Sequence, residues 1–166
     1  MKLSYLLLFI FILSFSAAFQ SCNKKEEESA YAEWKQKNEK FIDDIKNNPL
    51  YLQATIEQGP GTIYYEVINK GQGDTCALYT SQVKIYYKGY LFDEYVFDDW
   101  SKHITTMNVN SSITGFAVAL QKMKRGDKWK VYIPWELGYG ASGSGSKIPP
   151  YSALIFELEL VQISKY

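Results

Sequence analysis

Residues 113–133, ITGFAVALQKMKRGDKWKVYI, change from the apolar period of a helix to the apolar period of a strand. In the first part, apolar side chains recur three or four residues apart and share one helical face: Ile113, Phe116, Ala117, Leu120 and Met123. A turn at Gly126-Asp127 follows. From Lys128 to Ile133, polar and apolar side chains then alternate, which is typical of a strand with one buried face. The stretch therefore predicts a short helix followed directly by a strand.

The segments on both sides of this stretch also have the composition of strands. TIYYEVIN (62–69) and QVKIYYKGYL (82–91) are rich in β-branched and aromatic residues, and LIFELELV (154–161) alternates with period two. Residues 95–98 and 103–109 are shorter extended candidates. An antiparallel sheet must bury one face, and one short helix is available to cover it. We therefore predict an α+β fold with a sheet of five to six strands.

A second helical pattern precedes these strands, from Ser29 to Asn48, and Pro49 ends it. Its apolar side chains recur at spacings of three, four and seven: Tyr31, Trp34, Phe41, Ile42 and Ile45. This stripe could pack on the main domain, on a second copy or on a client protein. Residues 50–58 are ambiguous, and Gly59-Pro60-Gly61 is a clear break. We predict an N-terminal helical extension over 29–58 and a main domain over 59–166.

The first 22 residues, MKLSYLLLFIFILSFSAAFQSC, have the layout of a secretory signal, with Lys2 before an apolar run at 5–13. Ser21-Cys22 resembles the cleavage and acylation site of bacterial lipoproteins. We therefore predict a signal peptide over 1–21, lipidation of Cys22 and a charged tether over 22–28. This predicts a place in the bacterial envelope, at the outer membrane, on its periplasmic or surface face. The alternatives are cleavage near Ala17-Ala18, which leaves a plain thiol, and a disulfide with Cys76.

Composition excludes several function classes. The 18 Lys and Arg residues balance the 18 Asp and Glu residues, so the chain lacks the basic excess of a general nucleic-acid binder. Two Cys and one His are too few for a multi-ligand zinc site, and we predict no metal and no cofactor. Aromatic residues make up 16 % of the chain, without any acid–base or nucleophile motif beside them. Asp98 and Asp99 are neighbours, but adjacent strand residues point to opposite faces.

Several motifs appear in an order that resembles one family, the FKBP-type peptidyl-prolyl cis-trans isomerases. They are VKIYYKGYL (83–91), VFD (96–98), the 113–128 segment, YIP (132–134), LGYGA (137–141) and IPPYSALIFELEL (148–160). The resemblance covers about residues 62–164. It implies a twisted antiparallel sheet wrapped around a short helix, and rotation of Xaa-Pro bonds in an apolar aromatic pocket. It also implies proline-containing unfolded polypeptides as partners, and macrolides as candidate inhibitors.

The resemblance also implies which residues form the site. The pocket walls would be Tyr87, Phe97 and Phe156, with Asp98 as the one carboxylate and Tyr139 as a hydroxyl donor to substrate. The substrate-binding residues would be Ser112, the Ile113 N–H, Phe116 beneath the proline ring, and Ile148 at the entrance.

The sequence departs from the family pattern at four places. Phe116 replaces the usual Trp, Ser112 a branched aliphatic residue and Thr105 an aromatic one, and residues 93–96 replace a short glycine-containing turn. The alternative function is a non-catalytic peptide-binding or chaperone module anchored to the membrane. The sequence leaves the clients and the oligomeric state open.

Overall fold

The computed structural model describes residues 31–55 and 61–164 of the chain. The chain divides into two compact units, Met1–Trp34 and Lys35–Tyr166, and only residues 31–34 of the first unit are described. Residues 31–46 are helical. Among the described residues, no helix combines the length and the apolar character that crossing a membrane requires. The predicted signal peptide, Cys22 and the charged tether lie outside the described residues.

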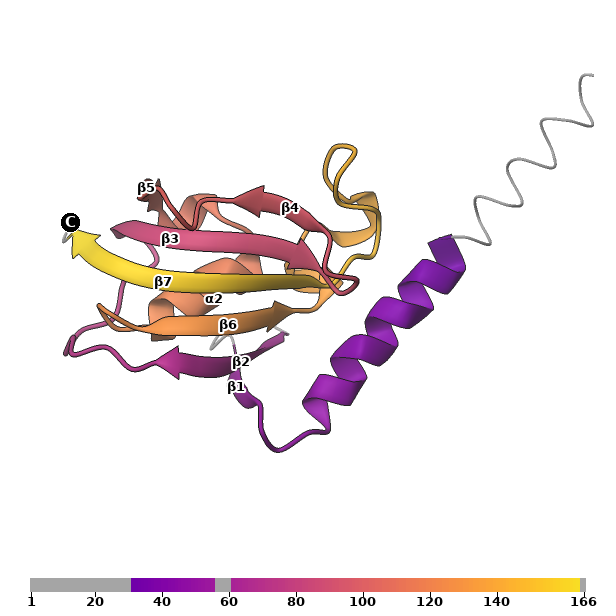
Figure 1. Ribbon diagram of the computed structural model, residues 1–166, viewed down its shortest axis with the longest axis horizontal. Helices are drawn as coiled ribbons and strands as arrows, with labels where there is room; N and C mark the ends of the chain where they lie inside the picture. Colours follow the sequence, from indigo (N-terminus) through magenta and orange to yellow (C-terminus); the bar gives the residue numbers. More distant parts are fainter. Residues whose placement is uncertain (1–30, 56–60, 165–166) are drawn as a thin grey trace, which may run out of the picture. The chain divides into compact units, whose positions relative to one another are not determined.

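Seven described strands form one sheet, in which all pairings are antiparallel (Figure 1). The strand order is β1-β2-β6-β7-β3-β4, and β5 also pairs with β3. The bounds are β1 Leu52–Thr55, β2 Thr62–Asn69, β3 Gln82–Leu91, β4 Val96–Asp99, β5 Thr105–Asn108, β6 Lys128–Ile133 and β7 Leu154–Ser164. The longest ladder joins β3 to β7 at the centre of the sheet.

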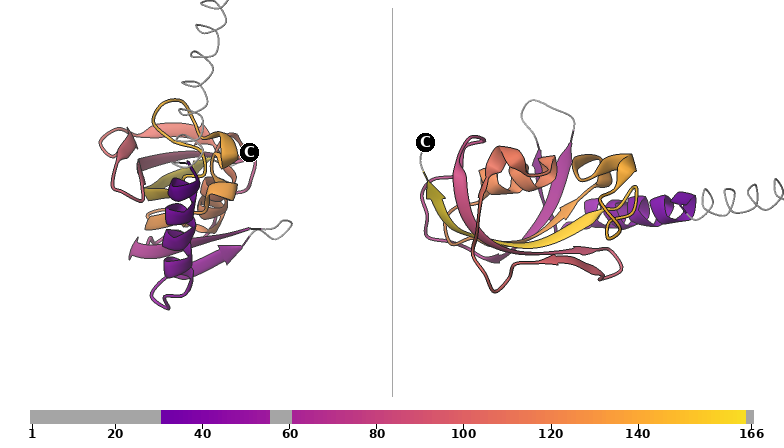
Figure 2. Two further views of the ribbon diagram at one scale, coloured as in Figure 1. Left: turned by 90° about the vertical axis from the view of Figure 1, so that its right-hand side faces the viewer. Right: turned by 90° about the horizontal axis from the view of Figure 1, so that it is seen from above.

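The sheet curves around one helix, α2 (Thr114–Lys122), as Figure 2 shows from above. The inward-facing side chains of β3, β6 and β7 and the buried face of α2 make the core. Its most buried members include Val83, Ile85, Leu120, Val131, Leu158 and Leu160, each 1 % exposed or less. The described residues also contain three short 3-10 helices: η1 Val109–Ser111, η2 Trp135–Leu137 and η3 Gly140–Ser142.

The predicted α+β fold is confirmed, with seven described strands where five to six were expected. The sequence left residues 50–58 ambiguous, and β1 lies within them. This strand has four residues, of which three are exposed, and it pairs only with β2 at the edge of the sheet. A short edge strand needs no buried alternation, so its sequence carries little of the period-two signal. The division into an extension over 29–58 and a domain over 59–166 stays a prediction.

The helix that precedes β1 packs on the outer face of the sheet. Ile42 and Ile45 are buried in a cluster with Tyr64, Tyr132 and Ile155. Phe41 adds ring contacts to this cluster, with its centroid 6.0 Å from the Phe92 ring and 6.1 Å from the Tyr132 ring. Of the three partners that the sequence left open for this apolar stripe, Phe41, Ile42 and Ile45 use the main domain.

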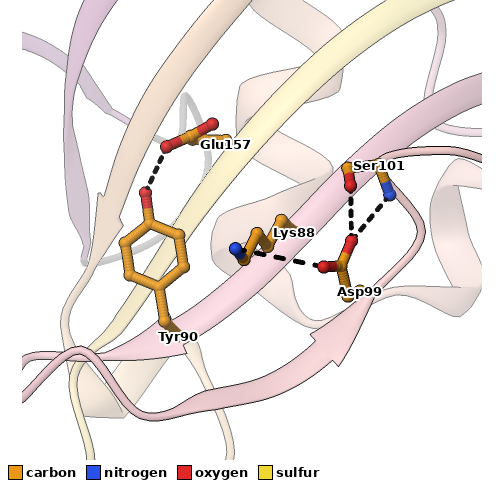
Figure 3. A network of polar contacts seen from close by, with 5 residues as sticks. All are labelled: Lys88, Tyr90, Asp99, Ser101 and Glu157. Atoms are coloured by element: carbon orange, nitrogen blue, oxygen red, sulfur yellow. Dashed lines mark hydrogen bonds and ion pairs between the residues drawn. The ribbon is translucent and has the colours of Figure 1, made fainter.

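The outer face also carries polar contacts between charged side chains, Tyr90 and Ser101 (Figure 3). The Tyr90 hydroxyl donates to Glu157 at 2.8 Å, and Lys88 Nζ lies 3.9 Å from Asp99. Asp99 also accepts bonds from the hydroxyl and then the backbone N–H of Ser101, which lower the pKa of its carboxyl group. The sheet thus has an apolar inner face and an outer face that is polar where the helix does not cover it.

Candidate active site

Four aromatic rings from four different elements meet on the inner side of the sheet. They are Tyr87 of β3, Phe97 of β4, Phe116 of α2 and Phe156 of β7. The Phe156 ring contacts the other three, with centroid distances of 5.0 Å to Phe116, 5.6 Å to Phe97 and 6.2 Å to Tyr87. The Phe116 and Tyr87 rings meet edge to face at 5.8 Å. The three Phe side chains are at most 7 % exposed, whereas Tyr87 is half-buried.

The strand register explains why these rings meet. Gly89 of β3 pairs with Asp98 of β4 on one side and with Phe156 of β7 on the other. A Cβ at Gly89 would lie 2.5 Å from ring atoms of Phe97 and 2.8 Å from the Phe156 ring. The absence of a side chain at this one strand position therefore makes the room in which the two rings pack.

The polar side of the cluster is formed by Asp98 and two tyrosines. The Tyr87 hydroxyl donates to Asp98 Oδ2 at 2.6 Å. Burial, followed by this hydrogen bond, raises the pKa of Tyr87 above its ordinary value. Burial and then the Asp98 charge also raise the pKa of Tyr139, so that hydroxyl lies within the field of the same carboxylate. Asp99 points to the other face, as strand geometry predicts, so the two carboxylates do not form an acid–base pair.

The 143–150 loop contacts β4 beside this cluster through one of its side chains. Ser144 and Ile148 exchange two backbone hydrogen bonds, at 2.8 and 3.2 Å, and close the loop as a tight hairpin. Ile148 is 6 % exposed. Lys147 Nζ donates to the Phe97 carbonyl oxygen at 3.1 Å, so the loop is fastened to β4 beside Asp98.

The remaining two predicted substrate-binding residues lie at the start of α2. Ile113 is the N-cap residue, and its carbonyl accepts the Ala117 N–H at 3.0 Å. Ser112 donates its hydroxyl to the Val109 carbonyl at 2.7 Å. The Ser112 side chain also lines a cavity of about 530 Å³ that shares none of the four rings. The structure thus brings together Tyr87, Phe97, Asp98, Phe116 and Phe156, and it places Ser112 beside a different cavity.

Sequence reasoning missed Gly89 and Lys147. A glycine inside a strand pattern can mark a close approach of other groups, and that signal was present at Gly89. Lys147 follows a run of Gly and Ser, where a lysine normally indicates a solvent-exposed loop. No local pattern indicated its bond to β4.

The buried tyrosines predict how stability depends on pH. Burial, and then hydrogen bonds to Asp98, Glu157 and Glu66, raise the pKa values of Tyr87, Tyr90 and Tyr132. Above about pH 10, the unfolded chain releases phenolic protons that the folded chain keeps. The free energy of unfolding should therefore be level up to about pH 10 and fall as the pH rises further.

Denaturant unfolding between pH 7 and pH 11 checks this expectation. Tyr132→Phe should weaken the alkaline decline, because it removes one such hydroxyl. Tyr79→Phe should leave the decline unchanged, because Tyr79 is 57 % exposed. A stability that is level through pH 11, or equal effects of the two substitutions, would contradict the prediction.

The family model of FKBP-type peptidyl-prolyl cis-trans isomerases matches residues 73–161, which include every residue of this cluster. The chain belongs to this family. It is 42 % identical over 103 residues to the FKBP-type 22 kDa peptidyl-prolyl cis-trans isomerase of Escherichia coli, an alignment that covers 61 % of this chain and 50 % of that protein. It is 33 % identical over 145 residues to the outer membrane protein MIP of Legionella longbeachae. That alignment covers 86 % of this chain and 58 % of the Legionella protein. The chain therefore spans about half the length of these curated relatives.

A solved structure agrees with the fold of this FKBP-family chain. The crystal structure of a peptidyl-prolyl cis-trans isomerase from Pseudomonas syringae superposes with a TM-score of 0.69 at 31 % identity. The match covers 78 % of this chain and 92 % of the Pseudomonas chain. The family resemblance that the sequence motifs indicated is thus confirmed, whereas the roles of individual residues stay predictions.

Proposed function

We propose that this chain catalyses cis-trans rotation of Xaa-Pro bonds in polypeptides and thereby assists the folding of exported proteins. The observation that carries the proposal is the contact of four rings around the Tyr87–Asp98 hydrogen bond. Such a site offers an apolar surface for a proline ring and few polar groups to orient the peptide. Among the described residues, no cluster of three metal-ligating side chains accompanies it.

The chemistry of this rotation suits an apolar site. Amide resonance sets a barrier of about 18–20 kcal/mol, and uncatalysed Xaa-Pro rotation takes on the order of tens to hundreds of seconds. Resonance places negative charge on the carbonyl oxygen of the planar amide, and the twisted transition state has less of this charge. Surroundings that exclude water therefore disfavour the planar state more than the twisted one, and the difference lowers the barrier.

In the proposed complex the proline ring lies against Phe116, and Tyr87, Phe97 and Phe156 form the walls around it. Asp98, held by Tyr87, faces the amide that rotates. The Ile113 N–H and the Tyr139 hydroxyl donate to substrate carbonyl groups and fix the peptide in a turn, which lowers the barrier further. Ile148 flanks the entrance, and Ser112 extends the binding surface at the start of α2.

An isomerase assay of the full chain with an Xaa-Pro peptide tests the proposal. The chain should accelerate cis-trans exchange in proportion to its concentration, and Phe97→Ala and Asp98→Ala should reduce the acceleration. Absence of acceleration, or two variants with wild-type rates, would reject the isomerase function. Peptide binding without acceleration would support the alternative, a non-catalytic peptide-binding module. The helix offers little to that alternative, because Ile42 and Ile45 are already buried against the sheet.

We also propose that Cys22 carries a lipid anchor that holds the protein in the bacterial envelope. The motifs at residues 1–22 support this, as does the name of the L. longbeachae relative, an outer membrane protein. Acyl chains contribute about 0.8 kcal/mol per buried CH₂, so several chains on one Cys hold a protein at a membrane.

Cys22→Ser should move the protein from the membrane fraction to the soluble fraction. Cys76, an exposed residue, provides the control: Cys76→Ser should leave the protein in the membrane fraction. Unchanged membrane association of Cys22→Ser would reject the anchor.

A further inference from the structure

Lys35 of the N-terminal helix contacts two segments that lead to the proposed site. Its Nζ lies 5.4 Å from the centre of the Trp135 ring and 4.9 Å from the centre of the Tyr151 ring. The two rings meet edge to face at 5.1 Å. Trp135 begins the segment that leads to Tyr139, and Tyr151 closely follows Ile148. One ammonium group therefore connects both segments through cation–π contacts.

One turn further along the helix, Asn38 makes a buried hydrogen bond to the same region. Its side-chain oxygen accepts the Ala153 backbone N–H at 2.8 Å, and Asn38 is 0 % exposed. Ala153 stands between Ile148 and Phe156, directly before β7. A buried amide oxygen is normally kept paired, so this bond fixes the backbone where the loop enters the strand that carries Phe156.

The segment between Ile148 and Ala153 has local bonds that fix its shape. Ser152 Oγ donates to the Pro149 carbonyl at 2.7 Å, and the Tyr151 N–H donates to the Gly140 carbonyl at 3.0 Å. Tyr151 has a φ of 60°, in the left-handed region that is unfavourable for a side chain of this size. Such a conformation persists only where surrounding contacts hold it, and the Tyr151 ring is held between Trp135 and Lys35.

We propose that Lys35 and Asn38 are positioning residues for the isomerase site. They hold residues 148–153 against the body of the domain, and this keeps Ile148 at the entrance of the aromatic cluster in the place that substrate binding requires. The inference rests on the proposed function, and it gives the N-terminal helix a role in substrate affinity. Neither side chain belongs to the aromatic cluster, so their effect on the reaction passes through the 148–153 segment.

Hydrogen exchange and kinetics of the full chain test this role. In Lys35→Met and Asn38→Leu, the amides of Ile148, Tyr151 and Ala153 should exchange about tenfold faster or more. The KM for an Xaa-Pro peptide should rise about threefold to tenfold, with kcat within about twofold of wild type. Lys35→Arg should restore both properties, because a guanidinium group also binds aromatic faces.

Lys40→Met is the matched control. Lys35 and Lys40 both make i,i+4 ion pairs on this helix, with Glu39 at 3.6 Å and Asp44 at 2.8 Å. Both substitutions to Met thus remove an ion pair that supports the helix, but only one removes a contact to Trp135 and Tyr151. In Lys40→Met, the exchange rates of the 148–153 amides and the KM for the Xaa-Pro peptide should equal the wild-type values.

Three results would overturn the proposal. The 148–153 amides could keep wild-type exchange in Lys35→Met; exchange could rise equally at the Leu158 amide in the central ladder; or Lys40→Met could act as Lys35→Met does. If the wild-type chain has no isomerase activity, the proposed function fails, whereas the exchange measurements still decide whether the helix holds this segment.

Discussion

Phe97→Ala should lower kcat/KM for an Xaa-Pro peptide by about 100-fold, which corresponds to about 3 kcal/mol of lost transition-state stabilisation. Phe97 is 7 % exposed, and its ring packs edge to face on Phe156 at 5.6 Å. Its removal opens one wall of the cluster to water and weakens the apolar surroundings that favour the twisted amide. The measurement is the rate of cis-trans exchange against peptide concentration, together with denaturant unfolding of the same variant.

The control for this prediction is a ring deletion elsewhere in the sheet. Tyr65 of β2 stacks on Trp129 at 4.1 Å, and neither ring belongs to the cluster. Tyr65→Ala should lower the free energy of unfolding and leave kcat/KM near the wild-type value. Equal activity losses in the two variants would mean that general destabilisation, rather than loss of the pocket wall, explains the result for Phe97→Ala.

The inner face of the sheet could be predicted from sequence because inward-facing and outward-facing residues alternate along each strand. Leu154, Phe156, Leu158 and Leu160 were expected on one face of the last strand, and all four are at most 4 % exposed. The opposite directions of Asp98 and Asp99 followed from the same period-two rule. The cluster itself was reached through ordered motifs, because alternation places a ring on a face without saying which other ring it meets.

Contacts between distant segments were beyond the reach of these local patterns. Ile155 and Tyr132 alternate with the core side chains and should face solvent, yet each is 5 % exposed because the N-terminal helix covers them. Asn38 and Lys35 lie among polar helix residues that indicate a solvent-facing surface. The bond from Ala153 to Asn38 spans 115 positions. Only the docking of the helix on the sheet brings these groups together, and the sequence left that partner open.

Gly89→Ala should lower both the stability and the isomerase activity of the protein, although the same change in an unconstrained strand is usually favourable. Gly89 is buried in β3, and an added Cβ would lie 2.5 Å from Phe97 ring atoms and 2.8 Å from Phe156. The Phe97 and Phe156 rings pack against each other, so neither ring can move away from the added methyl group without disturbing that contact. Overpacking of this kind costs about 1–3 kcal/mol. We also expect kcat/KM to fall about tenfold or more, because the displaced rings line the proposed pocket.

A double-mutant cycle separates this steric cause from a general effect of the substitution. In Phe97→Leu the smaller side chain leaves room for the methyl group that Gly89→Ala adds, so Gly89→Ala should be less destabilising in that background. The coupling should be about 0.5–3 kcal/mol in the free energy of unfolding, as for residues in direct contact. The double variant should still have a reduced kcat/KM, because the Phe97 ring is missing. Additive stability effects, or a Gly89→Ala variant as stable as wild type, would show that the two rings can move apart freely and that Gly89 is not required for their packing.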